Sequence, residues 1–587
     1  MKFNALAAAA LAGLFATLPV QAHDDHAQIV HLMDQEVATR NIYRVHFPDE
    51  ATGRKAAVTF HANLLASNWK AGYLVMQLEP QQIEQLKSFK FKVQPDEAFL
   101  AKRDDMLRRL QAAGTPSLLG QAAGQRQALQ ATEVGIESIP GYACYETVEE
   151  TFAAAQGFAT TYPNLAAWFD IGNSWEKTQG LGGHDLMVLK LTNKSTTGPN
   201  GEAKPILFAN AAIHAREYTT APLMLAFARQ LLEGYGSNAD ATWILDHHEV
   251  HLLLQTNPDG RKKAETGLSW RKNTNQNYCG ANSNNRGADL NRNFSQSWNS
   301  TGGSGSSGRT CDLTYRGPSA GSEPETQAVE NYIRSLWPDR RGPNRNDAAP
   351  ADTSGIHLDI HSYSELVLWP WGDSSAAAPN GTALRTLGRK FAWFNGYLPQ
   401  QSVGLYPTDG TSDAPSYGEL GVAAFTFELG TSFFQSCTTY DNTIKPKNLP
   451  ALLYAAKVVR TPYLTPSGPD VTALALPAKA TTTGVAAGKA VKLTATVSDT
   501  RYSTRNGTEA SQNIAGGEAY IDTPPWMPGA VPIALKATDG AFNATTENLQ
   551  VKLPTAGLAP GKHTVYVRGR DAAGNLGAIS AVFLVIR

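Results

Sequence analysis

The middle of the chain alternates short apolar runs with longer amphipathic segments. Apolar runs predict strands at residues 206–210, 250–255, 356–360, 365–369 and 423–429. After the first run, Thr219-Thr220-Ala221-Pro222 predicts a helix start with a hydroxyl cap and an early proline, and Gly234 marks the helix end. Strands that alternate with helices predict an α/β sheet covered on both faces, which we place within residues 139–465.

The segment before this region has a mixed pattern. Residues 57–60 and 73–78 form β-like apolar runs, whereas residues 97–113 carry apolar side chains at near-helical spacing. A stretch rich in Gly, Gln and Ala follows at residues 114–132 and is typical of a linker. We therefore expect an α+β region with its linker over residues 23–138.

The pattern changes again after residue 465. Short alternating runs, such as residues 491–497 and 563–568, are separated by Gly, Pro and Asn. This spacing predicts a small all-β sandwich of immunoglobulin-like type over residues 466–587. Within it, Trp526 is better explained by packing than by glycan binding. The Gly- and Ser-rich residues 301–308 in the middle region are predicted to form a surface loop.

The first residues indicate export. Lys2 precedes an apolar run over residues 5–18, and Val20-Gln21-Ala22 matches a small-residue cleavage site. The run is short for a membrane anchor, and no later segment offers about 18 uncharged apolar residues. We expect a signal peptide over residues 1–22, a mature chain that begins near His23, and a soluble protein secreted to the periplasm or the extracellular space.

Composition excludes several classes of function. The 587 residues carry 51 basic and 52 acidic side chains, for a formal net charge of -1. This balance gives no electrostatic basis for binding nucleic acid or an anionic membrane. Four cysteines, an even number, favour disulfides in an exported chain, and three pairings are possible: Cys144, Cys279, Cys311 and Cys437.

Two histidines follow or end predicted strands. His214 and Glu217 lie three residues apart directly after the 206–210 run, and His361 ends the 356–360 run. A lone H-x-x-E is weak as a motif, but catalytic zinc sites typically use two histidines, one glutamate and an open position. Because ligands gather at the carboxyl ends of strands in α/β sheets, both histidines can reach one edge. For isolated histidines, a structural role in the core is the better interpretation.

Three further strings carry reactive side chains. Arg271, in Trp-Arg-Lys-Asn, offers a guanidinium that suits an oxyanion. Asn291 and Arg292, in Asp-Leu-Asn-Arg-Asn, place an amide beside a guanidinium and suit a carboxylate. Glu428 ends an apolar strand, which raises the pKa of its carboxyl and suits it to general base catalysis.

Taken together, these strings resemble the zinc metallocarboxypeptidases, the family of pancreatic carboxypeptidases A and B. The resemblance covers roughly residues 140–460 and preserves the order HxxE, NPDG, WRKN, DLNRN, HSYS and FTFEL. It implies a mixed-sheet catalytic domain, one zinc ion, and hydrolysis of the C-terminal peptide bond of peptides and proteins that have a free terminal carboxylate.

Carried over residue by residue, the resemblance assigns the zinc ligands to His214, Glu217 and His361. Glu428 is implied as the general base that activates the zinc-bound water. Arg271 is implied to hold the developing oxyanion. Asp289 matches the carboxylate that orients the first zinc histidine.

The resemblance also implies a set of substrate-binding residues. Asn291 and Arg292 bind the terminal carboxylate of the substrate, and Arg216 lies on the approach path. Tyr406 matches the mobile tyrosine that closes over the substrate, with Tyr417 as the alternative.

Asp413 falls where the family sets its preference for the terminal side chain. An acid there resembles the carboxypeptidase B pattern and predicts preference for Lys or Arg. However, Ala414 and Pro415 follow where relatives often have a second acid and an aromatic residue. A loop shifted by one residue predicts an apolar or mixed preference instead.

Two structural expectations complete the resemblance. The family disulfide corresponds to Cys279–Cys311, which leaves Cys144 with Cys437. Residues 23–138 resemble the inhibitory prosegment in size and position, with basic residues at which an activating cut is expected: Lys102, Arg103, Arg108 and Arg109. We expect a zymogen, and a monomer.

Two other functions fit the same fold. Trimming of cell-wall peptides, or deacylation, would not need the carboxylate-binding group of Asn291, Arg292 and Tyr406. A non-catalytic binding protein would be expected to lack Glu428 or a zinc ligand, and every one of these residues is present.

Overall fold

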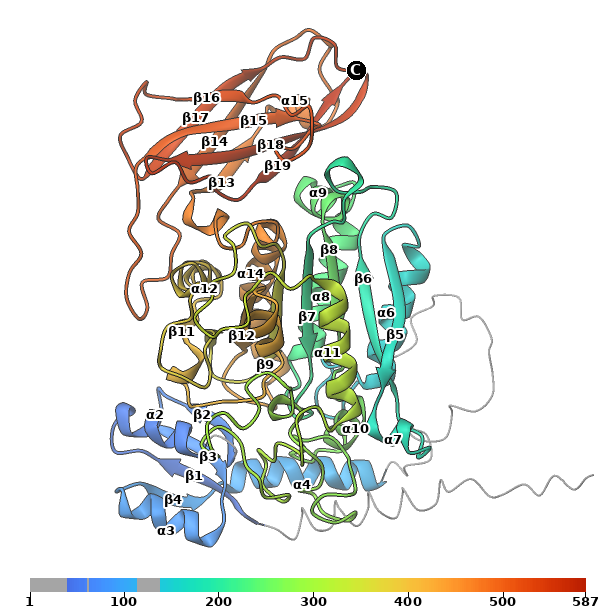
Figure 1. The fold of residues 1–587 in the computed structure, drawn as a ribbon, viewed down its shortest axis with the longest axis vertical. Helices are drawn as coiled ribbons and strands as arrows, with labels where there is room; N and C mark the ends of the chain where they lie inside the picture. The colour runs from blue at the N-terminus through green and yellow to red at the C-terminus, as the bar shows by residue number, and fades with distance from the viewer. Residues whose placement is uncertain (1–39, 61–62, 113–137) are drawn as a thin grey trace, which may run out of the picture.

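The computed structural model describes residues 40–60, 63–112 and 138–587. They form an N-terminal, a central and a C-terminal unit, each built around its own sheet (Figure 1). The predicted signal peptide and the 114–132 linker lie outside the described residues. Across the described part of the chain, we find no helix that is both long and apolar enough to cross a membrane.

The N-terminal unit is a four-stranded antiparallel sheet with helices, and its strand order is β2-β3-β1-β4. Its elements are β1 (Ile42–His46), α2 (Glu50–Thr59), β2 (Leu64–Asn68), β3 (Tyr73–Gln77), α3 (Pro80–Ser88), β4 (Lys92–Pro95) and α4 (Glu97–Ala112). The predicted helix over residues 97–113 is confirmed as α4. The predicted strand at residues 57–60 is wrong, because residues 57–59 belong to α2 and Phe60 directly follows it; Ala56 and Phe60, four residues apart, are both buried.

The central unit contains a mixed sheet with strand order β11-β10-β12-β9-β7-β8-β6-β5. Its strands are β5 (Ala166–Asn173), β6 (Asp185–Leu191), β7 (Ile206–Ala211), β8 (Glu249–Leu253), β9 (Ile356–His361), β10 (Leu366–Trp369), β11 (Leu398–Gln401) and β12 (Ala423–Glu428). The inner strands β8, β7, β9 and β12 are parallel, whereas β10 and β6 pair antiparallel to them. All five strands predicted in this region are present.

Helices cover both faces of this sheet, as predicted. They are α6 (Val148–Thr161), α7 (Trp175–Thr178), α8 (Thr220–Gly234), α9 (Ala239–His247), α10 (Pro258–Glu265), α11 (Pro324–Leu336), α12 (Gly381–Asn395), α13 (Cys437–Thr439) and α14 (Lys445–Val458). Along β7, Leu207 and Ala209 pack in the core with α8, α12 and α14, whereas Phe208 packs with α11 on the other face. The predicted hydroxyl cap of α8 is wrong: the Thr219 side chain accepts no capping bond, and the Thr220 hydroxyl donates to the Glu217 carbonyl instead.

Short helical turns connect several of these elements. They are η2 (Pro199–Gly201), η3 (Leu290–Arg292), η4 (Ser402–Gly404), η5 (Pro415–Glu419), η6 (Tyr440–Ile444) and η7 (Thr465–Ser467). Of these, η3 contains two of the predicted site residues.

The C-terminal unit is a nearly closed antiparallel sheet with strand order β13-β14-β17-β16-β15-β18-β19. Its elements are β13 (Asp470–Ala475), α15 (Ala478–Thr481), β14 (Val491–Ser498), β15 (Ile514–Ile521), β16 (Ile533–Ala537), β17 (Thr546–Leu553), β18 (Gly561–Asp571) and β19 (Ser580–Ile586). The all-β prediction is confirmed, and both runs quoted for it lie inside strands, β14 and β18.

The C-terminal unit shares buried contacts with the central unit (Figure 1). Trp526 packs against the main core, with its ring centroid 5.7 Å from that of Trp243 and Arg460 above its face at 4.7 Å. Lys390 of α12 forms a buried ion pair with Asp470 at the start of β13, at 3.0 Å. Trp526 therefore has the predicted packing role.

The N-terminal unit contacts the central unit through an exposed strand edge. In β2, the Ser67 amide donates to the Thr431 carbonyl at 3.1 Å, and the Leu65 carbonyl accepts from the Phe433 amide at 3.4 Å. Phe433 and Tyr363 of the central unit complete the apolar core of the N-terminal unit. This contact lies directly beyond Glu428 and His361 in the sequence.

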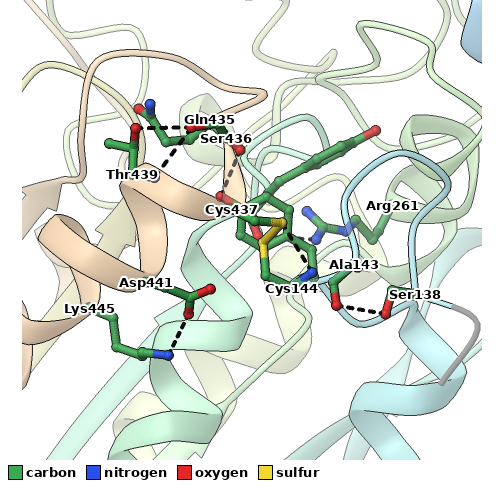
Figure 2. Close-up of a disulfide and its surroundings, with 12 residues drawn as sticks. Ser138, Ala143, Cys144, Arg261, Gln435, Ser436, Cys437, Thr439, Asp441 and Lys445 are labelled. Atoms are coloured by element: carbon green, nitrogen blue, oxygen red, sulfur yellow. Dashed lines mark hydrogen bonds and ion pairs between the residues drawn. A yellow bond between two sulfur atoms is a disulfide. The ribbon is translucent and has the colours of Figure 1, made fainter. Parts of the chain in front are cut away.

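Both predicted disulfides are present, so all four cysteines are paired. Cys279–Cys311 brackets η3 in the sequence, with a separation of 32 residues. Cys144–Cys437 joins segments 293 residues apart, the start of the central unit and α13 (Figure 2).

Candidate active site

Four predicted site residues lie at the carboxyl ends of three neighbouring strands. Strands β7, β9 and β12 are parallel, with β9 in the middle, so their carboxyl ends meet at one edge of the sheet. His361 ends β9 and lies in register with Glu428, which ends β12. His214 and Glu217 lie in the turn after β7, where Ala212 adopts a left-handed conformation with a φ of 54°.

His214, Glu217 and His361 form one compact donor set. One ligand atom from each residue lies within 4.8 Å of the others. Nδ1 of His214 lies 2.8 Å from one Glu217 carboxylate oxygen, and Nδ1 of His361 lies 3.1 Å from the other. Two imidazole nitrogens and a carboxylate match the donors of many catalytic zinc sites.

A further carboxylate holds the other ring nitrogen of each histidine. Nε2 of His214 lies 3.1 Å from Asp289, and Nε2 of His361 lies 2.7 Å from Asp359. These contacts aim both Nδ1 atoms at the shared centre, as partners of metal-binding histidines typically do. Asp359 was not predicted, although its position two residues before His361 on one strand puts both side chains on the same face.

The charges of this donor set favour a bound cation. Burial opposes the charge of Glu217, but His214 and His361 lower the pKa of its carboxyl well below the usual range. Burial likewise opposes the charge of His361, but Asp359 and Glu217 raise its pKa well above the usual range. The carboxylates therefore stabilise positive charge at this point. A zinc ion supplies that charge and accepts the Nδ1 lone pairs, so the residues fit zinc.

Glu428 is the predicted general base. Its side chain is buried, and burial raises the pKa of its carboxyl to about 8, with Glu217 and Asp359 raising it further and His361 and Arg271 opposing them. A carboxyl with that pKa exchanges protons near neutral pH, as general base catalysis requires. The direction of this shift agrees with the prediction from the apolar strand.

Arg271 is tied to the metal-binding residues through Asp289. Its Nε and Nη2 both donate to Asp289 Oδ2, at 3.0 and 2.8 Å, while Oδ1 of the same carboxylate faces His214. Within the described residues, Nη1 of Arg271 has no hydrogen-bond partner, and the Arg271 side chain is buried.

Asn291 lies against the metal-binding residues from the side of η3. Asp289 caps this turn by accepting from the Asn291 amide at 3.1 Å. The Asn291 side-chain amide lies 3.0 Å from Nε2 of His361 and 3.2 Å from Asp359, while its carbonyl oxygen accepts from the Ser412 amide at 2.7 Å. Asn291 thus connects the η3 turn with the loop that carries Asp413.

Arg292 faces the predicted mobile tyrosine. Its Nε donates to the Gly305 carbonyl at 2.8 Å, and its guanidinium carbon lies 5.9 Å from the Tyr406 ring centroid. Tyr417, the alternative tyrosine, is fully buried, and its hydroxyl bonds to Asn380. The structure therefore places Tyr406, and not Tyr417, beside Arg292.

One cavity unites most of the predicted residues. Its lining consists of His214, Glu217, Asn291, Arg292, His361, Leu368, Gly372, Ser402, Leu405, Tyr406, Thr408, Thr411, Asp413, Thr426 and Glu428. Burial raises the pKa of Asp413 to about 6. The hydroxyl residues of the lining, namely Ser402, Thr408, Thr411 and Thr426, were not predicted, because single hydroxyl residues carry no motif.

Three predicted residues are absent from that lining: Asp289, Arg271 and Arg216. Arg271 lies behind Asp289, as described above. The guanidinium of Arg216 stacks 4.1 Å above the Phe433 ring, and its Nη1 donates to Ser269 at 3.2 Å. Phe433 also packs into the N-terminal unit, so Arg216 lies between the donor set and that unit.

Comparisons with known proteins agree with this geometry. The profile of the zinc carboxypeptidase family matches residues 152–448. A zinc carboxypeptidase of Saccharothrix mutabilis subsp. capreolus is 33% identical over 331 residues, which cover 53% of this chain and 69% of that protein. Human mast cell carboxypeptidase A is 32% identical over 306 residues, which cover 50% of this chain and 65% of that protein.

Solved structures share the fold. Thrombin activatable fibrinolysis inhibitor aligns with a TM-score of 0.50 at 21% identity, over 71% of this chain and 98% of that one. Carboxypeptidase A of Helicoverpa armigera aligns with the same TM-score and identity, over 70% and 95% of the two chains. The chain belongs to the zinc carboxypeptidase family, metal-dependent hydrolases that use one zinc ion and act on the C-terminal end of peptides.

Proposed function

We propose that this chain removes C-terminal residues with a zinc ion held by His214, Glu217 and His361 and with Glu428 as general base. The observation that carries the proposal is the register of His361 with Glu428 across adjacent parallel strands, which sets the base beside the donor set. When bound, zinc acidifies water and polarises a carbonyl. Glu428 accepts the proton of the attacking water and passes it to the leaving amine.

The remaining residues hold the substrate. Arg271 stabilises the negative oxygen that develops on the scissile carbonyl, with Nη1 as the donor. Asn291 and Arg292 bind the terminal carboxylate, and Arg216 guides it on the approach path. Tyr406 closes over the bound substrate. Its position beside Arg292 supports this role.

We further propose that Asp413 selects C-terminal Lys or Arg. Its place in the cavity lining, among hydroxyl side chains, supports a polar pocket. Because burial raises the pKa of Asp413 to about 6, the carboxyl is neutral below that pH and attracts a basic side chain only above it. The ratio of kcat/KM for Arg-ending to Leu-ending substrates therefore rises as pH passes through about 6. A flat ratio would contradict this preference.

We also propose that the N-terminal unit inhibits the enzyme until a protease removes it. The contacts of β2 with residues 431–433 support this proposal, because they cover the segment directly after Glu428. The basic residues proposed for cleavage lie on α4, where Arg103 is buried and Lys102 and Arg108 are exposed. Of the described side chains, Lys102 and Arg108 are therefore the accessible sites.

The enzyme is proposed to be secreted and monomeric, with a C-terminal unit of immunoglobulin-like type. The signal-like residues 1–22 and the two disulfides support export to an oxidising compartment. Constant-type immunoglobulin domains have one sheet of four strands and one of three. The strand order of the C-terminal unit supports the proposal, because β13-β14-β17-β16 corresponds to the first sheet and β15-β18-β19 to the second.

The decisive experiment is an assay of purified protein, before and after limited trypsin treatment, on blocked dipeptides ending in Arg, Lys, Phe or Leu. Release of the terminal residue should stop with a zinc chelator and return when zinc is restored. Glu428→Gln should lower kcat by about 10³- to 10⁴-fold, because it removes the base but keeps the shape of the side chain.

The outcomes separate the alternatives. Release of Phe or Leu but not Arg or Lys keeps the enzyme class and removes Asp413 from the specificity assignment. A Glu428→Gln enzyme with normal kcat rules out the general base. No release from any substrate, even after the cut and with zinc bound, favours deacylation, cell-wall peptide trimming or a binding role.

A further inference from the structure

The orientation of Arg292 depends on a loop that is distant from it in the sequence. Its guanidinium donates to the backbone carbonyl of its neighbour Asn291 and, through Nε, to the carbonyl of Gly305 at 2.8 Å, and Tyr406 is a further hydrogen-bond partner. Gly305 lies in the Gly/Ser loop (residues 301–308), which was predicted to be a surface loop. Gly305 is instead buried within that loop. The position of one carbonyl therefore helps to set the direction of Arg292.

A single hydroxyl fixes that segment of the Gly/Ser loop. The Gly305 amide donates to the Thr301 hydroxyl at 2.7 Å, and the same hydroxyl donates to Asp409 at 2.5 Å. The Thr301 amide also donates to this carboxylate oxygen, at 3.1 Å. Asp409, Thr301, Gly305 and Arg292 thus form one chain of hydrogen bonds, which we call the Asp409 relay.

The packing around the relay leaves little room for movement. A Cβ atom on Gly305 would lie 2.9 Å from the Thr301 hydroxyl and 2.9 Å from Cα of Thr408. A Cβ atom on Gly410, whose φ is +62°, would lie 2.5 Å from the Arg292 carbonyl oxygen. The backbone is therefore tightly packed at Gly305 and at Gly410, near both ends of the relay.

Burial of Asp409 lowers the stability of the folded state. Its side chain is 1% exposed, and its Oδ1 has no hydrogen-bond partner among the residues that the structure describes. A buried carboxylate with one unsatisfied oxygen destabilises the folded state. Such a residue breaks the rules of stable packing, which natural proteins do mainly at functional sites.

We propose that Asp409 is a positioning residue which, through Thr301 and Gly305, holds Arg292 in the direction that binds the terminal carboxylate of the substrate. This inference rests on the proposed role of Arg292. The relay does not touch the reacting atoms, so it acts on recognition of the carboxylate and not on the chemical step. It therefore contributes to discrimination between a free C-terminus and a blocked one.

The test compares two substitutions of similar size at one position. Thr301→Val removes the hydroxyl that links Asp409 to Gly305, whereas Thr301→Ser keeps it. Thr301→Val should raise KM for a blocked dipeptide about fivefold with kcat unchanged, because the interaction it weakens is equally strong in the ground state and the transition state. Thr301→Ser should stay within about twofold of the unchanged enzyme.

A binding measurement separates positioning from general loss of structure. The inhibition constants of N-acetyl-arginine and its C-terminal amide are compared for each enzyme. Thr301→Val should weaken the free acid about fivefold and leave the amide unaffected, since the amide lacks the charge that Arg292 recognises. Asp409→Asn, which keeps an acceptor for Thr301, should retain most of the preference that Asp409→Ala loses.

Several results would overturn the proposal. Equal KM values for Thr301→Val and Thr301→Ser would show that the hydroxyl does not matter. A parallel loss for acid and amide, or a fall in kcat with unchanged KM, would show a different role. Arg292→Ala serves as the reference: if it leaves KM unchanged, the proposed carboxylate site is itself wrong. An unsubstituted enzyme without activity would instead contradict the proposed function.

Discussion

The N-terminal unit meets the central unit along one strand edge, whereas the C-terminal unit inserts aromatic and charged side chains into it. The first contact includes backbone bonds to residues 431–433, a small apolar cluster with Phe433 and Tyr363, and contacts of α4, where Phe99 packs against Phe434 and Lys102 lies over Tyr142. The second includes Tyr520 and Tyr566 within the main core, Trp526 packed against it, and the buried pair of Lys390 and Asp470. Separation of the first contact exposes a small apolar cluster, whereas separation of the second exposes part of the main core and a buried ion pair.

The difference also concerns location. The edge contact lies beside the ends of β9 and β12, where His361 and Glu428 are found, so its removal changes access to the site. The C-terminal contact lies at the opposite end of these strands (Figure 1). We therefore expect changes at the N-terminal contact to alter activity and changes at the C-terminal contact to alter stability.

The largest effect is expected from Lys390→Met. It leaves the buried Asp470 with only the longer contact to Arg501, at 4.0 Å, which should lower the free energy of unfolding by about 3 kcal/mol. Urea denaturation measures the loss, and Lys390→Met/Asp470→Leu should recover most of it. A loss below about 1 kcal/mol for the single variant would show that the C-terminal contact is as weak as the edge contact.

Separation of the N-terminal unit should have the next largest effect. A docking free energy of about 2.7 kcal/mol keeps roughly 99% of the molecules closed, so a cut in or after α4 should raise kcat/KM about 100-fold. The assay is release of the terminal residue from a blocked dipeptide over the course of the cut. Full activity of the uncut chain would contradict an inhibitory role.

A smaller effect is expected from Phe99→Ala, which weakens the same contact without a cut. Phe99 of α4 packs edge-on against Phe434, at 6.4 Å between ring centroids. Loss of about 1 kcal/mol of docking should raise kcat/KM of the uncut chain about fivefold and leave the melting temperature of the central unit unchanged. An activity gain that persists after the cut would show that Phe99 does not act through docking.

The smallest effect concerns acid. Burial lowers the pKa of His247, at the C-terminal contact, to about 4, with Asp246 opposing this shift and Arg460 adding to it. A histidine whose pKa is lower in the folded state stabilises fully above its ordinary value of 6.5, and this stability is lost as pH falls toward 4. Calorimetry should show that the melting temperature falls as pH is lowered over this range. His247→Asn should make that fall smaller by a few degrees.

The strands and the metal-binding residues could be predicted because their signals are local. Each ligand follows or ends an apolar run, and His214 and Glu217 are three residues apart. Asp359 had a local signal too, its position two residues before His361, but a single aspartate on a strand has no distinctive spacing. By contrast, the prediction at residues 57–60 failed because a short apolar run fits a helix and a strand equally well.

The substrate side of the site could be predicted only in part. Gly and Ser at residues 301–308 correctly indicate a loop, but composition does not tell where a loop packs. The contact of Thr301 with Asp409 joins residues 108 positions apart, and no periodic pattern connects them. The choice between Tyr406 and Tyr417 likewise needed the structure, because Tyr406 lies in the cavity lining beside Arg292 whereas Tyr417 is buried in η5.

The Cys144–Cys437 bond has a consequence for proteolysis. Together with the chain between its two cysteines, it makes the sheet and most of its helices into one covalent ring. A protease that cuts a loop within this ring opens the chain but leaves both pieces joined. A cut in α4 falls before Cys144, outside the ring, so it releases the N-terminal unit completely. The bond therefore confines separable cleavage to the ends of the molecule, where loss of a segment leaves the hydrolytic site assembled.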